Sequence, residues 1–190
     1  MATDPQPRTD AAQRFPDCVP VLRDRAGGVR LRPHEPGDTA DLVEACRDPQ
    51  TIRWTTVPVP DGGYTLSDAQ SFLELVATGW ADGDRLTWAI EAERGGRPRF
   101  CGSIHLLDEG AGRAEVGFLL HPAARGRSLM SSALRLVRDQ ALGVAGFEAV
   151  CWRSLPGNWA SRRAAAAAGS SSTGPYAVRC RTAGSSATPG

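Results

Sequence analysis

Three consecutive segments between residues 113 and 153 constrain the fold more strongly than any other part of the sequence. RAEVGFLL (113–120) alternates like a strand, residues 129–141 repeat apolar side chains with the period of a helix, and EAVCWR (148–153) is a short apolar strand. Two strands joined by a helical crossover become parallel neighbours in one sheet. The predicted buried stripe of the helix is Met130, Ala133, Leu134, Val137 and Ala141.

The strands that precede this unit are joined by turns instead of helices. LTWAIEA (86–92), FCGSIHLL (100–107) and residues 113–120 are separated by GGRPR and DEGAG, which are typical of hairpin turns. These strands are therefore expected to be antiparallel. The alternation in the first of them predicts one buried face made of Leu86, Trp88, Ile90 and Ala92.

The segments on either side complete the predicted order β-α-α-β-β-β-α-β-α. A short strand is expected at residues 29–32, a helix after Asp38, a loop at 54–63, and a second helix that Ser67 and Gln70 open as a capping box. The last helix is expected to run from Asn158 to Gly169. The predicted fold class is α/β (α+β): a mixed, mostly antiparallel sheet flanked by helices.

Composition divides the chain into three parts. Residues 1–28 are rich in Pro, Asp, Arg and Gly and are expected to be a disordered leader. Residues 29–169 are expected to be the folded domain. Residues 170–190, with the sequence SSSTGPYAVRCRTAGSSATPG, are mostly small and polar. We predict that this segment is an aberrant, disordered tail and that the last strands of the sheet are missing.

Charge and hydropathy exclude several classes of partner. The net charge of +1 gives no basis for binding nucleic acid or an anionic membrane surface. No segment approaches the roughly 20 apolar residues that span a bilayer, and the N-terminus lacks the apolar region of a signal peptide. The five cysteines and three histidines show no metal-ligand spacing, so no metal is expected. We expect a cytoplasmic protein with reduced thiols.

The loop HPAARGRSLM (121–130) joins the strand to the helix in the most informative segment. The start of a helix has unpaired backbone N–H groups and attracts negative charge. Gly126 and Ser128 are small enough for a ligand to approach the backbone, and Arg125 and Arg127 add positive charge. These features favour a pyrophosphate-binding site, although a solvated basic turn has the same composition.

The order EVGFLLHPAARGRSLMSSALRLV, EAVCWR and GNWASRR resembles the GNAT N-acetyltransferase superfamily. The segments WTTVPVP and YTLSDAQ are similar to the ribosomal-protein N-terminal acetyltransferase (RimJ/RimL-like) branch. The resemblance covers about residues 29–169. In the family loop, Gln/Arg-x-x-Gly-x-Gly/Ala, the glycine corresponds to Gly126, whereas Ala123 and Ser128 depart from the pattern.

The resemblance implies acetyl-coenzyme A as co-substrate. Its pantetheine would hydrogen-bond to the backbone of the strand before the loop, and its pyrophosphate would lie on the loop amides. The asparagine that contacts the coenzyme in the family corresponds to Asn158, which an ordinary N-cap role also explains. The implied binding residues are Phe118, Leu119, Leu120, Arg125, Gly126, Arg127, Ser128, Leu129 and Asn158.

The implied reaction is direct attack of an amine, from a small molecule or a protein N-terminus, on the thioester. A backbone N–H near Leu119 or Leu120 would stabilise the oxyanion. Glu115 is the candidate general base, unless it is simply a solvated strand carboxylate. Ser161 is the candidate acid for the leaving thiolate, with a helix-surface serine as the plain alternative, because Ala165 stands where many GNAT enzymes have tyrosine.

The tail leaves two functional hypotheses open. We hypothesise that a reading-frame shift replaced the last strand pair of the family and left a destabilised protein. The leading hypothesis is an active N-acetyltransferase, and the alternative is a non-catalytic remnant that binds coenzyme A weakly or not at all. A nucleotide-binding α/β domain fits less well, because the strands before the loop follow one another as hairpins.

Overall fold

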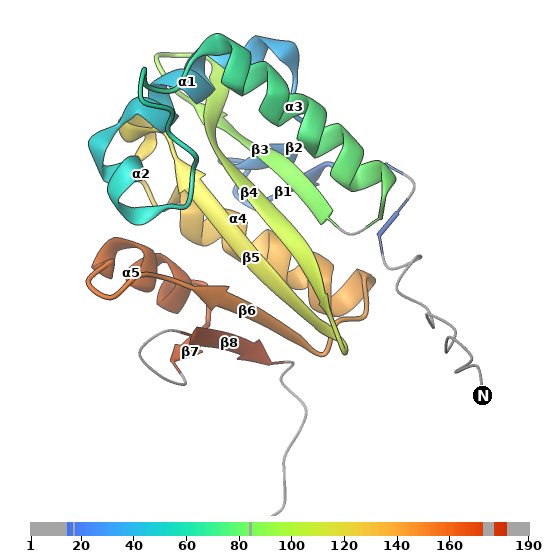
Figure 1. The fold of residues 1–190 in the computed structure, drawn as a ribbon. Coiled ribbons are helices and arrows are strands. Elements are labelled where there is room, and N and C mark those ends of the chain that lie inside the picture. The colour runs from blue at the N-terminus through green and yellow to red at the C-terminus, as the bar shows by residue number, and fades with distance from the viewer. Residues whose placement is uncertain (1–14, 17, 84, 173–176, 182–190) are drawn as a thin grey trace, which may run out of the picture.

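The computed structural model describes residues 15–16, 18–83, 85–172 and 177–181. In this part of the chain, one eight-stranded sheet has the order β1-β2-β3-β4-β5-β6-β8-β7 (Figure 1). All neighbours are antiparallel except β5 and β6, which are parallel, so the predicted mixed sheet is confirmed. The strands are β1 (Leu22–Arg23), β2 (Arg30–Arg32), β3 (Arg85–Glu93), β4 (Pro98–Gly110), β5 (Arg113–Leu120), β6 (Ala149–Arg153), β7 (Ser171–Ser172) and β8 (Ala177–Arg181).

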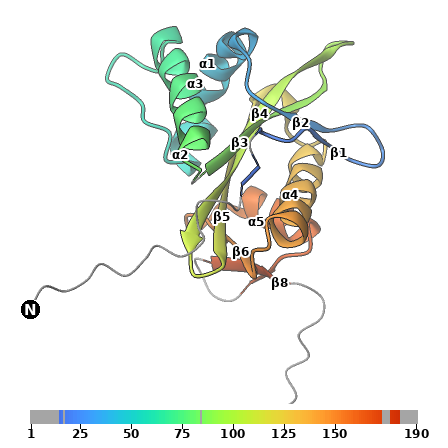
Figure 2. The same ribbon diagram turned by 90° about the vertical axis from the view of Figure 1, so that its right-hand side faces the viewer.

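Helices cover both faces of the sheet. Helices α1, α2 and α3 lie on one side, which we call the front face, and α4 and α5 lie on the other side, the back face (Figure 2). A π-helical turn at Gln140–Val144 continues α4. The bounds are α1 (Thr39–Arg47), α2 (Pro49–Trp54), α3 (Leu66–Ala81), α4 (Leu129–Asp139) and α5 (Trp159–Ala167), with 3-10 turns η2 (Pro36–Asp38) and η3 (Pro122–Ala124).

The core has one apolar cluster on each face of the sheet. The back cluster contains every residue of the predicted strand face and every residue of the predicted α4 stripe. The front cluster joins Leu42 and Cys46 of α1 and Ala69 of α3 to Ala89 and Phe100 of the sheet. The buried positions of β3 and α4 therefore follow the periods of 2 and 3.6 that predicted them.

Helix α3 begins earlier than predicted, and the expected capping box is wrong. Thr65 is the N-cap, and its Oγ1 accepts a hydrogen bond from the Asp68 backbone N–H at 3.2 Å. The Asp68 carboxylate accepts one in return from the Thr65 N–H at 2.7 Å. Ser67 lies inside the first turn. The segment TLSD contains the same reciprocal pattern two residues earlier, and an aspartate replaces the usual glutamate.

Helix α2 was not predicted: no element was expected at residues 49–53, and the expected loop began at residue 54. Its N-cap is Asp48, whose carboxylate accepts a hydrogen bond from the Thr51 N–H at 2.9 Å. Pro49 occupies the first helical position, where its fixed φ suits the helix and its missing N–H has no cost. The Asp48–Pro49 pair is therefore a signal for a helix start, but six residues are too few to show a helical repeat of apolar side chains.

A buried ion-pair network joins β2 and β3 to the start of α1. The guanidinium of Arg32 donates to both carboxylate oxygens of Asp38, at 2.9 and 2.8 Å, and to Glu91 at 2.7 Å. The side chains of Arg32 and Asp38 are only 6% and 5% exposed. Hydrogen bonding to Asp38 raises the pKa of Arg32, so the guanidinium keeps its charge in the interior.

The prediction that the last strands are missing is wrong. Strand β8 pairs with β6 along its whole length, from Ala149–Arg181 to Arg153–Ala177, and with the short strand β7. Without β8, one edge of β6 would be unpaired, and main-chain hydrogen bonds to that edge require an extended chain more than a particular side-chain pattern. The segment AVRCR also alternates Val178 and Cys180 with Arg179 and Arg181. Residues 173–176 and 182–190 of the predicted disordered tail lie outside the described residues.

The predicted leader also contributes to the fold. β1 pairs with β2, and Phe15 packs in the back cluster with its ring centroid 5.9 Å from that of Phe147. Residues 15–16 and 18–28 are therefore not a purely disordered segment, and residues 1–14 and 17 lie outside the described part. Within the described residues, no helix combines the length and the hydropathy needed to cross a membrane.

Candidate active site

Strands β5 and β6 pair over a short distance and then separate. Their register ends at the Glu115–Cys151 pair. Beyond it, Trp152 and Arg153 pair with β8, whereas residues 116–120 pair with β4. Figure 1 shows the two strands diverging. The second half of β5 thus has a strand edge that no described strand covers, and we call this opening the β5–β6 gap.

Backbone geometry determines which peptide groups face the gap. The N–H of His121 donates to the Cys101 carbonyl of β4 at 2.9 Å. Because peptide groups alternate in direction along a strand, Leu119 also faces β4, and Phe118 and Leu120 face the gap. The Leu120 carbonyl agrees with this assignment, since it accepts a hydrogen bond from outside the sheet.

Aromatic rings close the gap on the back face. The ring of Phe118 stacks on that of Trp152 with a centroid distance of 5.9 Å and an interplanar angle of 16°. Behind them, a cavity of about 20 Å³ lies between the sheet, α4 and α5 and is lined in part by Val116 and Ala165. This space is large enough for roughly one water molecule. The back side of the gap is therefore mostly filled.

The loop between β5 and α4 presents a row of unpaired amides. Gly126 and Ser128 both have left-handed backbone conformations, with φ of 75° and 58°. No N–H group from Gly126 to Ser131 hydrogen-bonds to another described residue, and the Ser128 side chain does not cap α4. A carbon built at the Cβ position of Gly126 would meet no atom within 4 Å. The loop thus offers open space beside several converging donors, as an anion site requires.

The two arginines of the loop are engaged by the protein itself. Arg125 hydrogen-bonds to Thr51 at 3.0 Å and to the Leu120 carbonyl at 3.3 Å, and it forms an ion pair with Asp48. Burial opposes the effect, but this guanidinium lowers the pKa of Asp48. Arg127 donates to the Glu93 carbonyl at 2.7 Å. The groups that the loop leaves free for an anion are therefore mainly those of its backbone, and Arg125 fixes the position of the loop against α2.

The sequence profile described as the acetyltransferase (GNAT) domain matches residues 29–171, which contain this gap and this loop. The chain belongs to the GNAT acetyltransferase family. Among proteins with curated annotation, none matches the sequence significantly.

Solved structures share the GNAT fold at low sequence identity. RimJ of Mycobacterium smegmatis, in complex with CoA-disulfide, has a TM-score of 0.73 at 20% identity, over 89% of each chain. A Vibrio cholerae protein described as a ribosomal-protein-serine acetyltransferase has a TM-score of 0.69 at 12% identity, over 85% of this chain and 97% of that one. The microcin C7 self-immunity acetyltransferase MccE, in complex with acetyl-CoA and AMP, has a TM-score of 0.69 at 15% identity, over 81% of this chain and 92% of that one.

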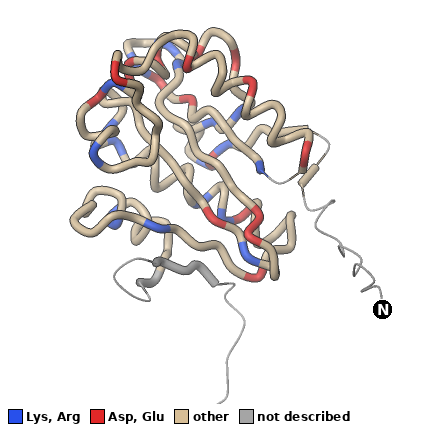
Figure 3. The backbone as a smooth tube through the Cα atoms, in the orientation of Figure 1, with Lys and Arg blue, Asp and Glu red and all other residues tan. Residues whose placement is uncertain are grey.

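Glu115, the predicted base of this GNAT protein, lies where β5 and β6 are still paired. Its carboxylate forms an ion pair with Arg153, which also contacts Glu109. Figure 3 shows acidic and basic positions gathered around the β4–β5 turn. Burial and the neighbouring Glu109 carboxylate raise the pKa of Glu115, while Arg153 opposes this shift. Glu115 is thus held at the closed end of the gap.

The structure places Asn158 and Ser161 together at the start of α5, on the back face. Asn158 is buried, and its Oδ1 accepts a hydrogen bond from the Ser161 N–H at 3.2 Å. The predicted N-cap role is therefore confirmed. Ala165 is buried one turn further along and cannot supply the acid that a tyrosine would supply.

Replacing Asn158 with alanine should destabilise α5 by about 1 kcal/mol, because one helix N–H loses its partner. Asn158→Ser should lose only a few tenths of a kcal/mol of stability, since a serine side chain caps a helix nearly as well as asparagine does. Urea unfolding of the two variants and the parent protein measures both values. Equal losses for alanine and serine would show that the cap hydrogen bond does not stabilise the helix.

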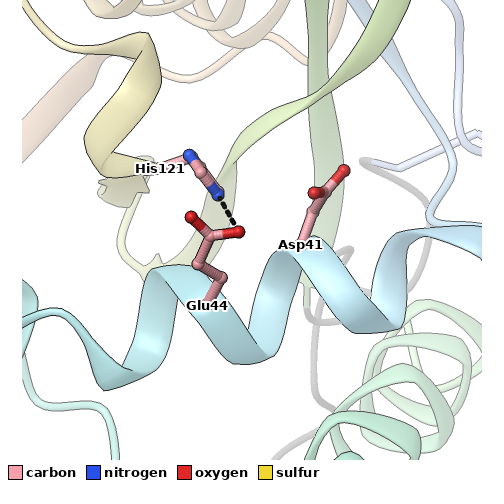
Figure 4. A group of neighbouring side chains, drawn as sticks. All are labelled: Asp41, Glu44 and His121. Carbon is pink, nitrogen blue, oxygen red and sulfur yellow. Dashed lines mark ion pairs between the residues drawn. The ribbon is translucent and has the colours of Figure 1, made fainter.

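A second cluster contains Asp41, Glu44 and His121, whose ligand atoms lie within 4.8 Å of one another (Figure 4). His121 Nδ1 accepts a hydrogen bond from the Ala123 N–H, so in the neutral ring Nε2 carries the proton. Nε2 faces Glu44 at 3.3 Å without good hydrogen-bond alignment. Asp41 is already paired with Arg94. His121 Nε2 therefore has no free lone pair in this arrangement, and Asp41 shares its charge with Arg94.

Sequence reasoning overlooked His105 because the three histidines are far apart in the chain. The register of the sheet places His105 opposite Gly117, beside the gap. The signal was available in principle: the hairpin of residues 100–120 fixes this pairing once its turn is located.

Proposed function

We propose that this protein transfers the acetyl group of acetyl-coenzyme A to a primary amine by direct attack on the thioester. The observation that carries the proposal is the unpaired row of N–H groups from Gly126 to Ser131, next to the open edge of β5. The residues fit a coenzyme A diphosphate, because the loop offers amide donors and space without a competing side chain. Leu129 contributes one of these amides.

The pantetheine would extend along the gap as an additional strand. Its amides would hydrogen-bond to the peptide groups of Phe118 and Leu120, which face the gap, as β-strand addition requires. The same geometry selects between the two predicted oxyanion donors. Because the N–H of Leu119 faces β4, the N–H of Leu120 is the better donor for the thioester oxygen.

The amine nitrogen would bond to the carbonyl carbon, and the carbon–sulfur bond would break. Glu115 would receive the nitrogen proton through water, since its ion pair with Arg153 keeps it at the closed end of the gap. Ser161 would orient a water molecule that protonates the thiolate. Placing the two reactants side by side supplies much of the rate increase by itself.

The acceptor is a protein N-terminus or a small-molecule amine. The resemblance to the RimJ/RimL-like branch and the description of the Vibrio cholerae relative favour a protein N-terminus. MccE is described as a microcin C7 self-immunity acetyltransferase in complex with acetyl-CoA and AMP, which keeps a small molecule as the second candidate. We place the protein in the cytoplasm, where acetyl-coenzyme A is formed.

Titration calorimetry with acetyl-coenzyme A, followed by release of free thiol with a panel of amines, tests the proposal. The panel contains peptides with N-terminal serine or alanine and small primary amines. We expect binding and thiol release with at least one acceptor. Binding without release would favour the non-catalytic remnant, and a folded protein that binds no acetyl-coenzyme A would refute the assignment.

A further inference from the structure

The imidazole of His105 occupies the space that a side chain on Gly117 would fill. The two residues are directly opposite in the β4–β5 pair. A methyl carbon built on Gly117 would lie 2.5 Å from Nε2 of His105 and would overlap Cε1. Neighbouring strands are about 4.8 Å apart, so the ring must extend from β4 across to β5. Only glycine at position 117 permits this placement.

His105 differs from the other two histidines in how its nitrogens are used. His34 is sealed: its Nε2 contacts the Ser103 hydroxyl at 3.1 Å, and its Nδ1 is buried without a hydrogen bond. His121 Nε2 is buried in the same way. Neither nitrogen of His105 hydrogen-bonds to another described residue, and neither is a buried atom without a partner. His105 is half-buried, so its ring is not sealed in the way that the rings of His34 and His121 are.

The ring is also closer than Glu115 to the proposed oxyanion donor. Gly117 precedes Phe118, whose peptide group faces the gap, and Glu115 lies two residues further from Leu120. Two strand residues correspond to about 6.6 Å. His105, Gly117 and Glu115 share the front face, which is the side of the gap that the Phe118–Trp152 stack leaves open.

We propose that His105, in place of Glu115, is the catalytic residue that accepts the proton of the attacking amine, an inference that rests on the proposed function. The nitrogen forms its bond to the carbonyl carbon, and its proton passes to Nε2 of His105. The carbon–sulfur bond breaks, and the thiolate takes up that proton by way of water, which leaves an amide, free thiol and a neutral imidazole.

The protonation state of the ring suits this role. Burial, with a smaller contribution from the positive charge of Arg85 on β3, lowers the pKa of His105 to about 4. Arg85 is the only charged side chain among the described residues that shifts it. At neutral pH the ring is therefore uncharged and can accept a proton as the amine nitrogen becomes acidic during bond formation.

Three variants test the proposal, with the acceptor that the amine panel identifies. His105→Gln should lower kcat by about 100-fold or more, the usual contribution of a general base, with acetyl-coenzyme A affinity nearly unchanged. His105→Ala should lose as much and recover activity when free imidazole is added. Gly117→Ala should also lower kcat, because its methyl group displaces the ring. Gly143→Ala, where the methyl group meets no atom within 4 Å, is the control.

Thermal melting and coenzyme A titration of each variant separate loss of folding from loss of chemistry. Imidazole rescue of a folded His105→Ala protein would support the proposal, because a purely structural role could not be rescued in this way. A His105→Gln protein with parental kcat would overturn it and leave the proposed function intact. A parental protein that transfers acetyl to no member of the panel would overturn both.

Discussion

Asp38→Asn should destabilise the protein by about 3 kcal/mol, because it leaves the guanidinium of Arg32 buried without its main counter-charge. Because Glu91 still pairs with Arg32 in this variant, the expected loss of stability lies at the lower end of the roughly 3–5 kcal/mol that a broken buried ion pair costs. For a chain of this size the loss corresponds to a fall in Tm of roughly 6–12 °C. Thermal melting and urea unfolding measure it.

Asp139→Asn is the matched control, since it breaks an ion pair of the same kind at the surface. Asp139 pairs with Arg138 at 2.7 Å, but its side chain is 66% exposed. Exposed pairs contribute about 1 kcal/mol at most, so this variant should melt close to the parent. If the two variants melt at the same temperature, burial of the Arg32–Asp38 pair does not have the energetic role that we assign to it.

Gly126→Ala should raise the dissociation constant of acetyl-coenzyme A by about tenfold, or about 1.4 kcal/mol. The new methyl group has free space in the protein, so it meets the ligand instead. It would lie where the diphosphate must approach the amides of the loop. Titration calorimetry measures the effect.

Backbone strain must be separated from this loss of contact, and Gly146→Ala makes the separation possible. Gly146 has a φ of 69°, against 75° at Gly126, and it also has no atom within 4 Å of a built Cβ. Both variants should therefore lose a similar stability, about 1–2 kcal/mol for a left-handed alanine. Only Gly126→Ala should bind more weakly. Equal weakening in both would remove the loop from the ligand site.

The sequence was sufficient to predict most of the architecture, because hydrophobic periods and hairpin turns are local signals. The stripe of α4, the buried face of β3 and the parallel β5–β6 pair were all predicted correctly. The end of the sheet was not, since β8 depends on an open edge of β6 more than on its own composition. A strand of that kind can be predicted only when the strand that it pairs with has already been placed in the sheet.

The sequence predicted the parts of the candidate site that are made of backbone groups. It did not predict the parts that depend on contacts between residues far apart in the chain. Gly126 and the amides after it follow from a strand–loop–helix pattern. The ion pair of Arg125 with Asp48 joins residues 77 positions apart, and the sequence suggested instead that Arg125 faces the ligand. Likewise, the closeness of His105 to the gap depends on the absence of a side chain at Gly117.

The contacts of Arg125 have a further consequence for how two ligands would influence each other. Through this one side chain, α2 on the front face and the loop proposed to receive the diphosphate share an ion pair and a hydrogen bond. A displacement of α2 by an incoming acceptor would change the energy of the loop, and ordering of the loop would change that of α2. Thermodynamic reciprocity then requires each ligand to alter the affinity of the other by the same factor.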